Sequence, residues 1–139
     1  EDPWGVPAGT VLVKHFEMQL DERQAARRRL ETRLLVAAEG GSFYGVTYRW
    51  NEAGTDAALL LQSETETLSI VGPDGLERQQ PYYFPGPSDC LTCHTSTAGY
   101  VLGLRTRQLN RELEYAPGLP AVNQLVAWSA WGRWLALSK

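Results

Sequence analysis

The sequence contains few of the residues that most often bind metals or form cross-links. Of 139 residues, two are cysteine, two are histidine and one is methionine. Two cysteines exclude both a framework of several disulfides and a zinc site built from four thiolates. A zinc site of two cysteines and two histidines would need both His15 and His94, the only histidines of the chain.

Long apolar runs and an excess of basic charge are also missing. The most apolar stretch, residues 121–137, is too short and too polar to span a bilayer. The net charge of −3 indicates neither nucleic acid nor an anionic membrane as a partner. The chain begins Glu1-Asp2-Pro3-Trp4 without the apolar segment of a signal peptide, so we expect a mature form or a domain excised from a larger protein.

The length and the apolar content indicate one globular domain over residues 1–139. Runs of β-branched and aromatic residues predict strands at residues 10–19, 30–38, 43–50, 67–71 and 76–84. Residues 21–28 read as a loop or short turn, and residues 57–61 are ambiguous between strand and helix. Glycine-containing turns at residues 40–41 and 72–75 predict two hairpins. In the strand at residues 43–50, we expect the aromatic side, which begins with Tyr44 and ends with Trp50, to face the core.

Helices are predicted later in the chain. Residues 106–113 are expected to be helical with Thr106 as a possible cap, and Pro120 suits the start of a final helix over residues 121–137. Strands that precede helices favour an α+β fold. We therefore predict an antiparallel β-meander, followed by one further turn that carries the candidate binding residues and by C-terminal helices.

That turn is the segment Cys90-Leu91-Thr92-Cys93-His94, which holds both cysteines of the chain. Cys-x-x-Cys-His is the attachment signature of c-type haem: the thiols form thioethers with the porphyrin vinyl groups, and the histidine binds the iron. On one helical turn, residues three and four apart share a face, so all three side chains can meet one ring. Ser88 or Asp89 is expected to cap this turn.

Other interpretations of the two cysteines have less support. Dithiol redox chemistry needs the motif beside a βαβ unit, whereas strands in a meander precede it here. A disulfide between Cys90 and Cys93 would close a very small loop and constrain little. Zinc binding would have to recruit the distant His15. We therefore expect one covalent haem c, with His94 as the proximal ligand.

The ligand on the distal side of the iron decides whether the haem is closed or open to small molecules. Met18 and His15 are the candidates, and because they lie three residues apart on a predicted strand, they face opposite sides of the sheet. We favour Met18, since thioether ligation suits an electron carrier of raised potential, with His15 as the alternative. An unliganded side would instead bind a gas or peroxide.

Other aromatic and basic residues are candidates for contacts with the haem. Tyr83 and Tyr100 flank the motif, and Arg105 is a candidate partner for the propionates. A core-packing role is the simpler interpretation of the three tryptophans on the final predicted helix, which are Trp128, Trp131 and Trp134.

The segment around the motif resembles the haem-c module of large secreted bacterial multidomain proteins. The resemblance is carried by residues 81–95, 98–104 and 108–110, and upstream and downstream by residues 9–17, 31–36, 44–52, 55–56 and 123–125. It implies a periplasmic or secreted location and a redox partner protein or a fused catalytic domain, often sugar-dehydrogenase-like. Many members of that family carry a second motif, whereas this chain has one. The strand-rich layout is more weakly similar to β-sheet cytochromes of the c-prime-beta type.

These observations predict a monohaem cytochrome domain that carries single electrons. The alternative is a gas-binding or sensor module with an open distal site. A peroxidase would need a distal base, for which only His15 is left. We therefore expect an electron-transfer module, serving a dehydrogenase, rather than an enzyme.

Overall fold

A computed structural model describes residues 4–103 and 105–131 and divides the chain into two compact units. The strand unit comprises residues 9–93, and the terminal unit comprises residues 1–8 and 94–139. The boundary between them falls inside the motif, between Cys93 and His94. The expectation of a single domain over residues 1–139 stays a prediction.

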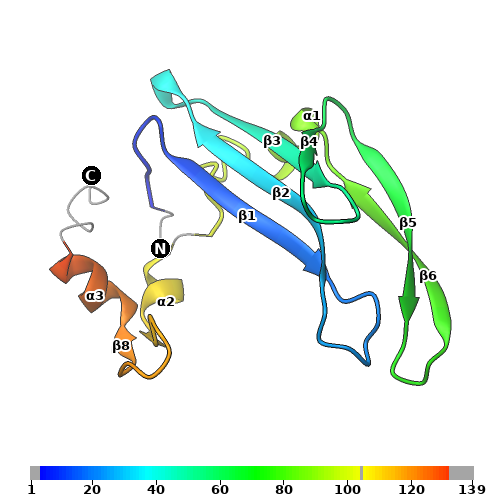
Figure 1. The fold of residues 1–139 in the computed structure, drawn as a ribbon. Coiled ribbons are helices and arrows are strands. Elements are labelled where there is room, and N and C mark those ends of the chain that lie inside the picture. Colours follow the sequence, from blue (N-terminus) through cyan, green and yellow to red (C-terminus); the bar gives the residue numbers. More distant parts are fainter. Residues whose placement is uncertain (1–3, 104, 132–139) are drawn as a thin grey trace. The chain divides into compact units, whose positions relative to one another are not determined.

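The strand unit contains an antiparallel sheet of four strands in the order β1-β2-β3-β4 (Figure 1). These strands are β1 (Val11–Met18), β2 (Arg28–Ala37), β3 (Phe43–Trp50) and β4 (Ala57–Leu59). The strands predicted at residues 10–19, 30–38 and 43–50 are confirmed, and the ambiguous segment at residues 57–61 contributes a short strand. Residues 21–27 form a connection, as predicted, but β2 already begins at Arg28, the last residue of the predicted loop.

A hairpin of β5 (Glu64–Val71) and β6 (Glu77–Phe84) forms a second sheet in the same unit. The predicted turn at residues 72–75 connects its strands, and Gly75 has a φ of 79°, which favours glycine. β5 begins three residues earlier than the predicted 67–71. The backbone N–H of Val71 donates to the carbonyl of Leu20 at 2.8 Å, which ties β5 to the connection after β1.

A buried apolar cluster joins the two sheets. Leu30 of β2 packs with Leu60, Leu68 and Phe84, and the half-buried Met18 lies against this cluster. The pairing of β1 with β2 slips by one residue and leaves Leu30 without an opposite residue in β1. A bulge of this kind bends a strand locally and changes where its side chains point. Leu30 is thereby available to the cluster.

The prediction that the aromatic side of β3 faces the core is wrong. Gly45 and Thr47, on the opposite side, are buried, whereas Tyr44 is 50% exposed and Trp50 is half-buried. The reason is tertiary. The short helix α1 (Pro87–Cys93) packs against β3 on the side of Gly45. Residue size on an isolated strand does not reveal which side a later segment covers.

The terminal unit contains α2 (Thr106–Leu109), β7 (Glu112–Leu113), β8 (Val122–Asn123) and α3 (Gln124–Ala130). The helix predicted at residues 106–113 is too long, because Glu112–Leu113 pairs instead with β8. Thr106 is the first helical residue rather than the cap, which is Arg105.

The final helix begins later than predicted. Residue 122 pairs with β7, and Asn123 caps α3 by accepting the backbone N–H of Leu125 at 3.0 Å. Residues 132–137 of the predicted helix, with Trp134, lie outside the described residues. Taken coarsely, the fold is α+β, mostly antiparallel sheet with a few short helices. No helix within the described residues is long and apolar enough to cross a membrane.

Candidate functional site

The helix α1 carries both cysteines and is fixed at its start by Asp89. Pro87 occupies the first helical position, where its missing N–H costs nothing. The Asp89 carboxylate accepts the Tyr83 hydroxyl at 2.7 Å and the Gly86 backbone N–H at 2.9 Å. These two hydrogen bonds, that from Tyr83 first, lower the pKa of Asp89. Asp89 thus lies within the first turn of α1, and its side chain reaches back to Gly86, which precedes the helix. The expectation that Ser88 or Asp89 is itself the N-cap is therefore wrong.

Cys90 is half-buried where α1 meets β3, and Cys93 is exposed. A Cβ at Gly45 would lie 2.5 Å from the Cys90 Sγ, so the two residues pack directly against each other. The Cys90 thiol lies 3.7 Å from the carbonyl oxygen of Gly86. Burial raises the pKa of Cys90, although the positive charge of Arg33 acts in the opposite direction.

A buried polar network lies beside Cys90. The Glu31 carboxylate is fully buried, forms an ion pair with Arg33 and accepts the Tyr82 hydroxyl at 2.7 Å. The Arg33 guanidinium also stacks over the Phe16 ring, 4.3 Å from its centroid. Burial, and then the hydrogen bond to Glu31, raise the pKa of Tyr82.

Sequence reasoning missed this network, although one signal was present. Glu31 and Arg33 lie two residues apart on a predicted strand and therefore share one face. Nothing in the sequence indicated that α1 and β6 would cover that face.

In the terminal unit, His94 is held by one backbone carbonyl. Its Nδ1 lies 2.6 Å from the carbonyl oxygen of Tyr100. Because a carbonyl oxygen only accepts hydrogen bonds, Nδ1 must carry a proton. In the neutral imidazole the lone pair is then on Nε2, the arrangement that most metal-binding histidines show.

The loop after the motif presents that carbonyl. The Tyr100 backbone N–H donates to Thr95 at 2.9 Å, and the Gly99 N–H donates to Ser96 at 3.0 Å. Tyr100 has a φ of 59°, and it is the one non-glycine residue with positive φ among those described. The turn therefore directs the carbonyl of Tyr100 back to His94. The sequence marked Tyr100 as a haem contact, but not its backbone as the partner of His94.

The other predicted contacts have more ordinary surroundings. Tyr83 is 52% exposed and is bound to Asp89, while Arg105 caps α2 and donates its backbone N–H to Gln108 at 3.0 Å. Trp128 packs edge-on with Trp4, with 6.5 Å between ring centroids. Trp131 packs similarly with Tyr115 at 5.1 Å. Trp128 is half-buried, which favours core packing, whereas Trp131 is 57% exposed, so its ring pair does not support a core-packing role.

Met18 is placed away from the thiols of the strand unit. It packs against the cluster of Leu30. Leu12, at the other end of β1, lies in the same cross-strand row as Gly45, which Cys90 contacts. Met18 is therefore roughly 20 Å along the sheet from that row. Ligation by Met18 stays a prediction, and the geometry of this unit does not support it.

His15 lies on the other side of the same sheet. Its Nδ1 is 2.7 Å from the Thr32 hydroxyl, and Thr32 is paired with Tyr48 of β3. Side chains alternate along a strand, so Tyr48 and Gly45 face opposite sides. The sheet thus separates His15 from Cys90, and distal ligation by His15 likewise stays a prediction without geometric support.

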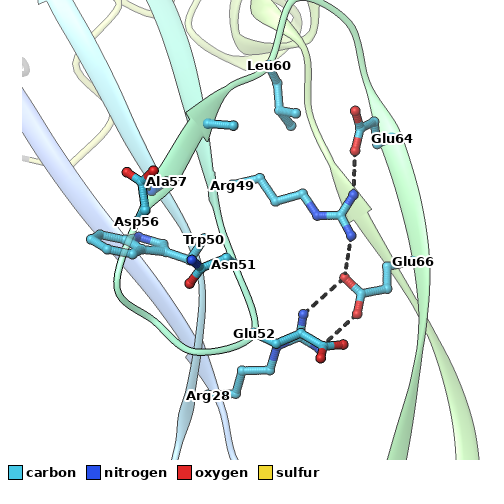
Figure 2. A pocket seen from close by; sticks show the side chains of 11 residues that line it. Arg28, Arg49, Trp50, Asn51, Glu52, Asp56, Ala57, Leu60, Glu64 and Glu66 are labelled. Carbon is cyan, nitrogen blue, oxygen red and sulfur yellow. Dashed lines mark hydrogen bonds and ion pairs between the residues drawn. The ribbon is translucent and has the colours of Figure 1, made fainter.

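A second candidate site is a pocket of about 430 Å³ in the strand unit (Figure 2). Arg49 points across it to Glu64 at 2.5 Å and to Glu66 at 2.8 Å, and Arg28 reaches Glu66 at 2.8 Å. The two guanidinium groups are therefore already paired with carboxylates. These ion pairs join β2 and β3 to β5, which gives the charged side of the pocket a structural role.

No three histidine, cysteine, aspartate or glutamate side chains among the described residues form a group that could hold a metal ion. Comparisons with protein-family models, curated proteins and solved structures found no match to this chain. The motif, the packing of Cys90 against Gly45 and the hydrogen bond of His94 to Tyr100 are therefore the features that bear on function.

Proposed function

We propose that this chain is a monohaem c-type cytochrome domain that transfers single electrons. The observation that carries the proposal is the hydrogen bond from His94 Nδ1 to the carbonyl of Tyr100. This hydrogen bond leaves the lone pair of Nε2 available to bind a metal, in a residue that directly follows the Cys-x-x-Cys pair. Metal-binding histidines commonly donate their other ring N–H to a backbone carbonyl in this way, which supports the proposed role of His94.

The residues present fit one haem. Cys90 and Cys93 are free thiols three residues apart on a helical turn, and each can add to one vinyl group of the porphyrin. His94 would bind the iron through Nε2, and the Tyr100 carbonyl orients the imidazole ring. When bound, the haem supplies one-electron chemistry at the iron. Tyr83, Tyr100 and Arg105 remain the proposed further contacts.

The alternative is a gas-binding or sensor module, and one observation favours it. Neither Met18 nor His15 is brought to the thiols of the strand unit. Without a sixth ligand, the iron would be open to carbon monoxide or nitric oxide. In either case we place the protein outside the cytoplasm, working with a redox partner or a fused catalytic domain.

The proposal is tested by maturing the chain in a bacterial periplasm equipped for haem attachment. We expect the intact mass to rise by one haem and the reduced protein to show sharp α and β bands. The variant Cys90→Ser/Cys93→Ser is the matched control and should remain colourless. A high-spin spectrum that shifts with carbon monoxide would select the alternative, and a bare polypeptide mass in the wild type would refute covalent haem.

A further inference from the structure

The two thiols of the motif differ in accessibility, although both belong to α1. Cys93 is exposed, whereas Cys90 is half-buried with its sulfur directed to Gly45 of β3. The Cys90 thiol is also within reach of the Gly86 carbonyl oxygen, at 3.7 Å. A reagent in solution therefore meets Cys93 directly, while Cys90 must first leave its contact with the sheet.

Gly45 makes this inward position of Cys90 possible. A Cβ at residue 45 would lie 2.5 Å from the Cys90 Sγ and would also overlap its Cβ. Non-bonded carbon atoms pack at about 3.5–4.0 Å, and sulfur is no smaller. Any other residue at this position would push Cys90 away from β3. Gly45 is therefore a positioning residue for Cys90, although it lies far from the motif in sequence.

We propose that the two thiols bond to haem in a fixed order, Cys93 first and Cys90 second, and that Gly45 sets this order. The inference rests on the haem function proposed above. In each step the sulfur bonds to the inner carbon of a vinyl group, the C=C bond becomes a single bond, and the thiol proton ends on the outer carbon. Each addition is balanced without an oxidant or a leaving group.

The raised pKa of Cys90 also favours Cys93 as the first thiol to react. Burial raises the pKa of Cys90, which lowers the fraction of reactive thiolate at neutral pH. After the first bond at Cys93, the second vinyl group would be held close to Cys90. Once α1 opens locally, the addition of Cys90 to this vinyl group is intramolecular, so the slower thiol still reacts efficiently.

The first test uses the full-length, haem-free, reduced chain and N-ethylmaleimide, with peptide mass spectrometry after timed quenching. We expect Cys93 to react about tenfold faster than Cys90 in the folded protein, because only Cys90 requires local opening. The rates should become equal in denaturant. In Gly45→Ala the ratio should fall toward one, whereas Gly103→Ala, where a Cβ meets nothing within 4 Å, should preserve it. Equal rates in the folded wild type would overturn the inference, whether or not Gly45→Ala folds.

The second test follows haem addition to the wild-type chain by timed peptide mapping. Partly reacted protein should carry haem on Cys93. Partly reacted protein with haem on Cys90 would overturn the order and leave the proposed function intact. If neither cysteine acquires haem, the proposed function fails and the inference fails with it, even if the maleimide rates differ.

Discussion

The imidazole Nδ1 of His94 and the carbonyl oxygen of Tyr100 are 2.6 Å apart, and the backbone of Tyr100 holds them there at a φ of 59°. Left-handed backbone of this kind costs most residues about 1–2 kcal/mol, but asparagine adopts it more readily. The free energy of unfolding of Tyr100→Asn should therefore be about 1 kcal/mol higher than that of Tyr100→Val. Both variants lose the tyrosine side chain, so the comparison isolates the backbone in a urea titration. Equal stability of the two variants would contradict the assigned conformation.

The hydroxyl of Tyr82 satisfies the buried carboxylate of Glu31 at 2.7 Å. Tyr82→Phe should lower the free energy of unfolding by about 1–3 kcal/mol, because one hydrogen bond to a buried charge is lost. Tyr83→Phe is the matched control, since the hydroxyl of Tyr83 serves the Asp89 carboxylate at an exposed position. Its effect should be clearly smaller. Denaturant unfolding of both variants measures the two effects. Similar losses of unfolding free energy in Tyr82→Phe and Tyr83→Phe would argue against the buried network.

The same hydrogen bond predicts a dependence on pH. Burial, and then the Glu31 carboxylate, raise the pKa of Tyr82 above its ordinary value of 10.0, so the folded state keeps this proton to higher pH than the unfolded state. Stability from this group is complete below about pH 10 and is lost as pH rises toward the folded pKa. The difference in unfolding free energy between wild type and Tyr82→Phe should shrink with rising alkaline pH. A constant difference would contradict the raised pKa.

Glu66 links Arg28 of β2 with Arg49 of β3. Burial alone would raise the pKa of Glu66, but hydrogen bonds and charges from Arg28, and then from Arg49, lower it overall. Glu66→Gln should cost about 1 kcal/mol at neutral pH. The contribution of Glu66 is present above about pH 4.5 and is lost as pH falls through the lowered folded pKa. The variant should therefore be less sensitive to acid than the wild type in a urea titration.

The matched control for Glu66 is Glu52→Gln in the same pocket. No ion pair of Glu52 is found within the described part of the chain. This change should leave the free energy of unfolding at neutral pH almost unaltered. Added salt should reduce the difference between Glu66→Gln and wild type while hardly affecting Glu52→Gln. Equal losses for the two variants would remove the role assigned to the ion pairs.

Met18 provides a prediction that separates packing from ligation. Because it packs against the cluster of Leu30, Met18→Leu should change the free energy of unfolding by less than about 1.5 kcal/mol. The absorption spectrum of the haem-loaded protein should stay unchanged, since β1 carries Met18 away from the row of Gly45. A spectrum that changes would instead identify Met18 as the distal ligand, as the sequence led us to expect.

The local signals of the sequence agree with much of the strand unit. Period-two patterns and the turn around Gly75 predicted strands and hairpins that the structure contains, because strand propensity and turn chemistry depend on neighbouring residues. The helix predicted at residues 106–113 ends at Leu109, and Glu112 pairs instead with β8. Helical propensity there is weaker than the backbone hydrogen bonds that a partner strand supplies.

What the sequence by itself determined is the chemistry: two thiols and an imidazole, spaced for one helical turn, with no other cysteine in the chain. Only the tertiary structure decided their surroundings. It placed Cys90 against Gly45, turned the carbonyl of Tyr100 to His94 and put Met18 at the far end of β1. The physical reason is that covalent spacing fixes which groups can act together. Burial, tautomer and reach are instead set by segments that the chain brings together only on folding.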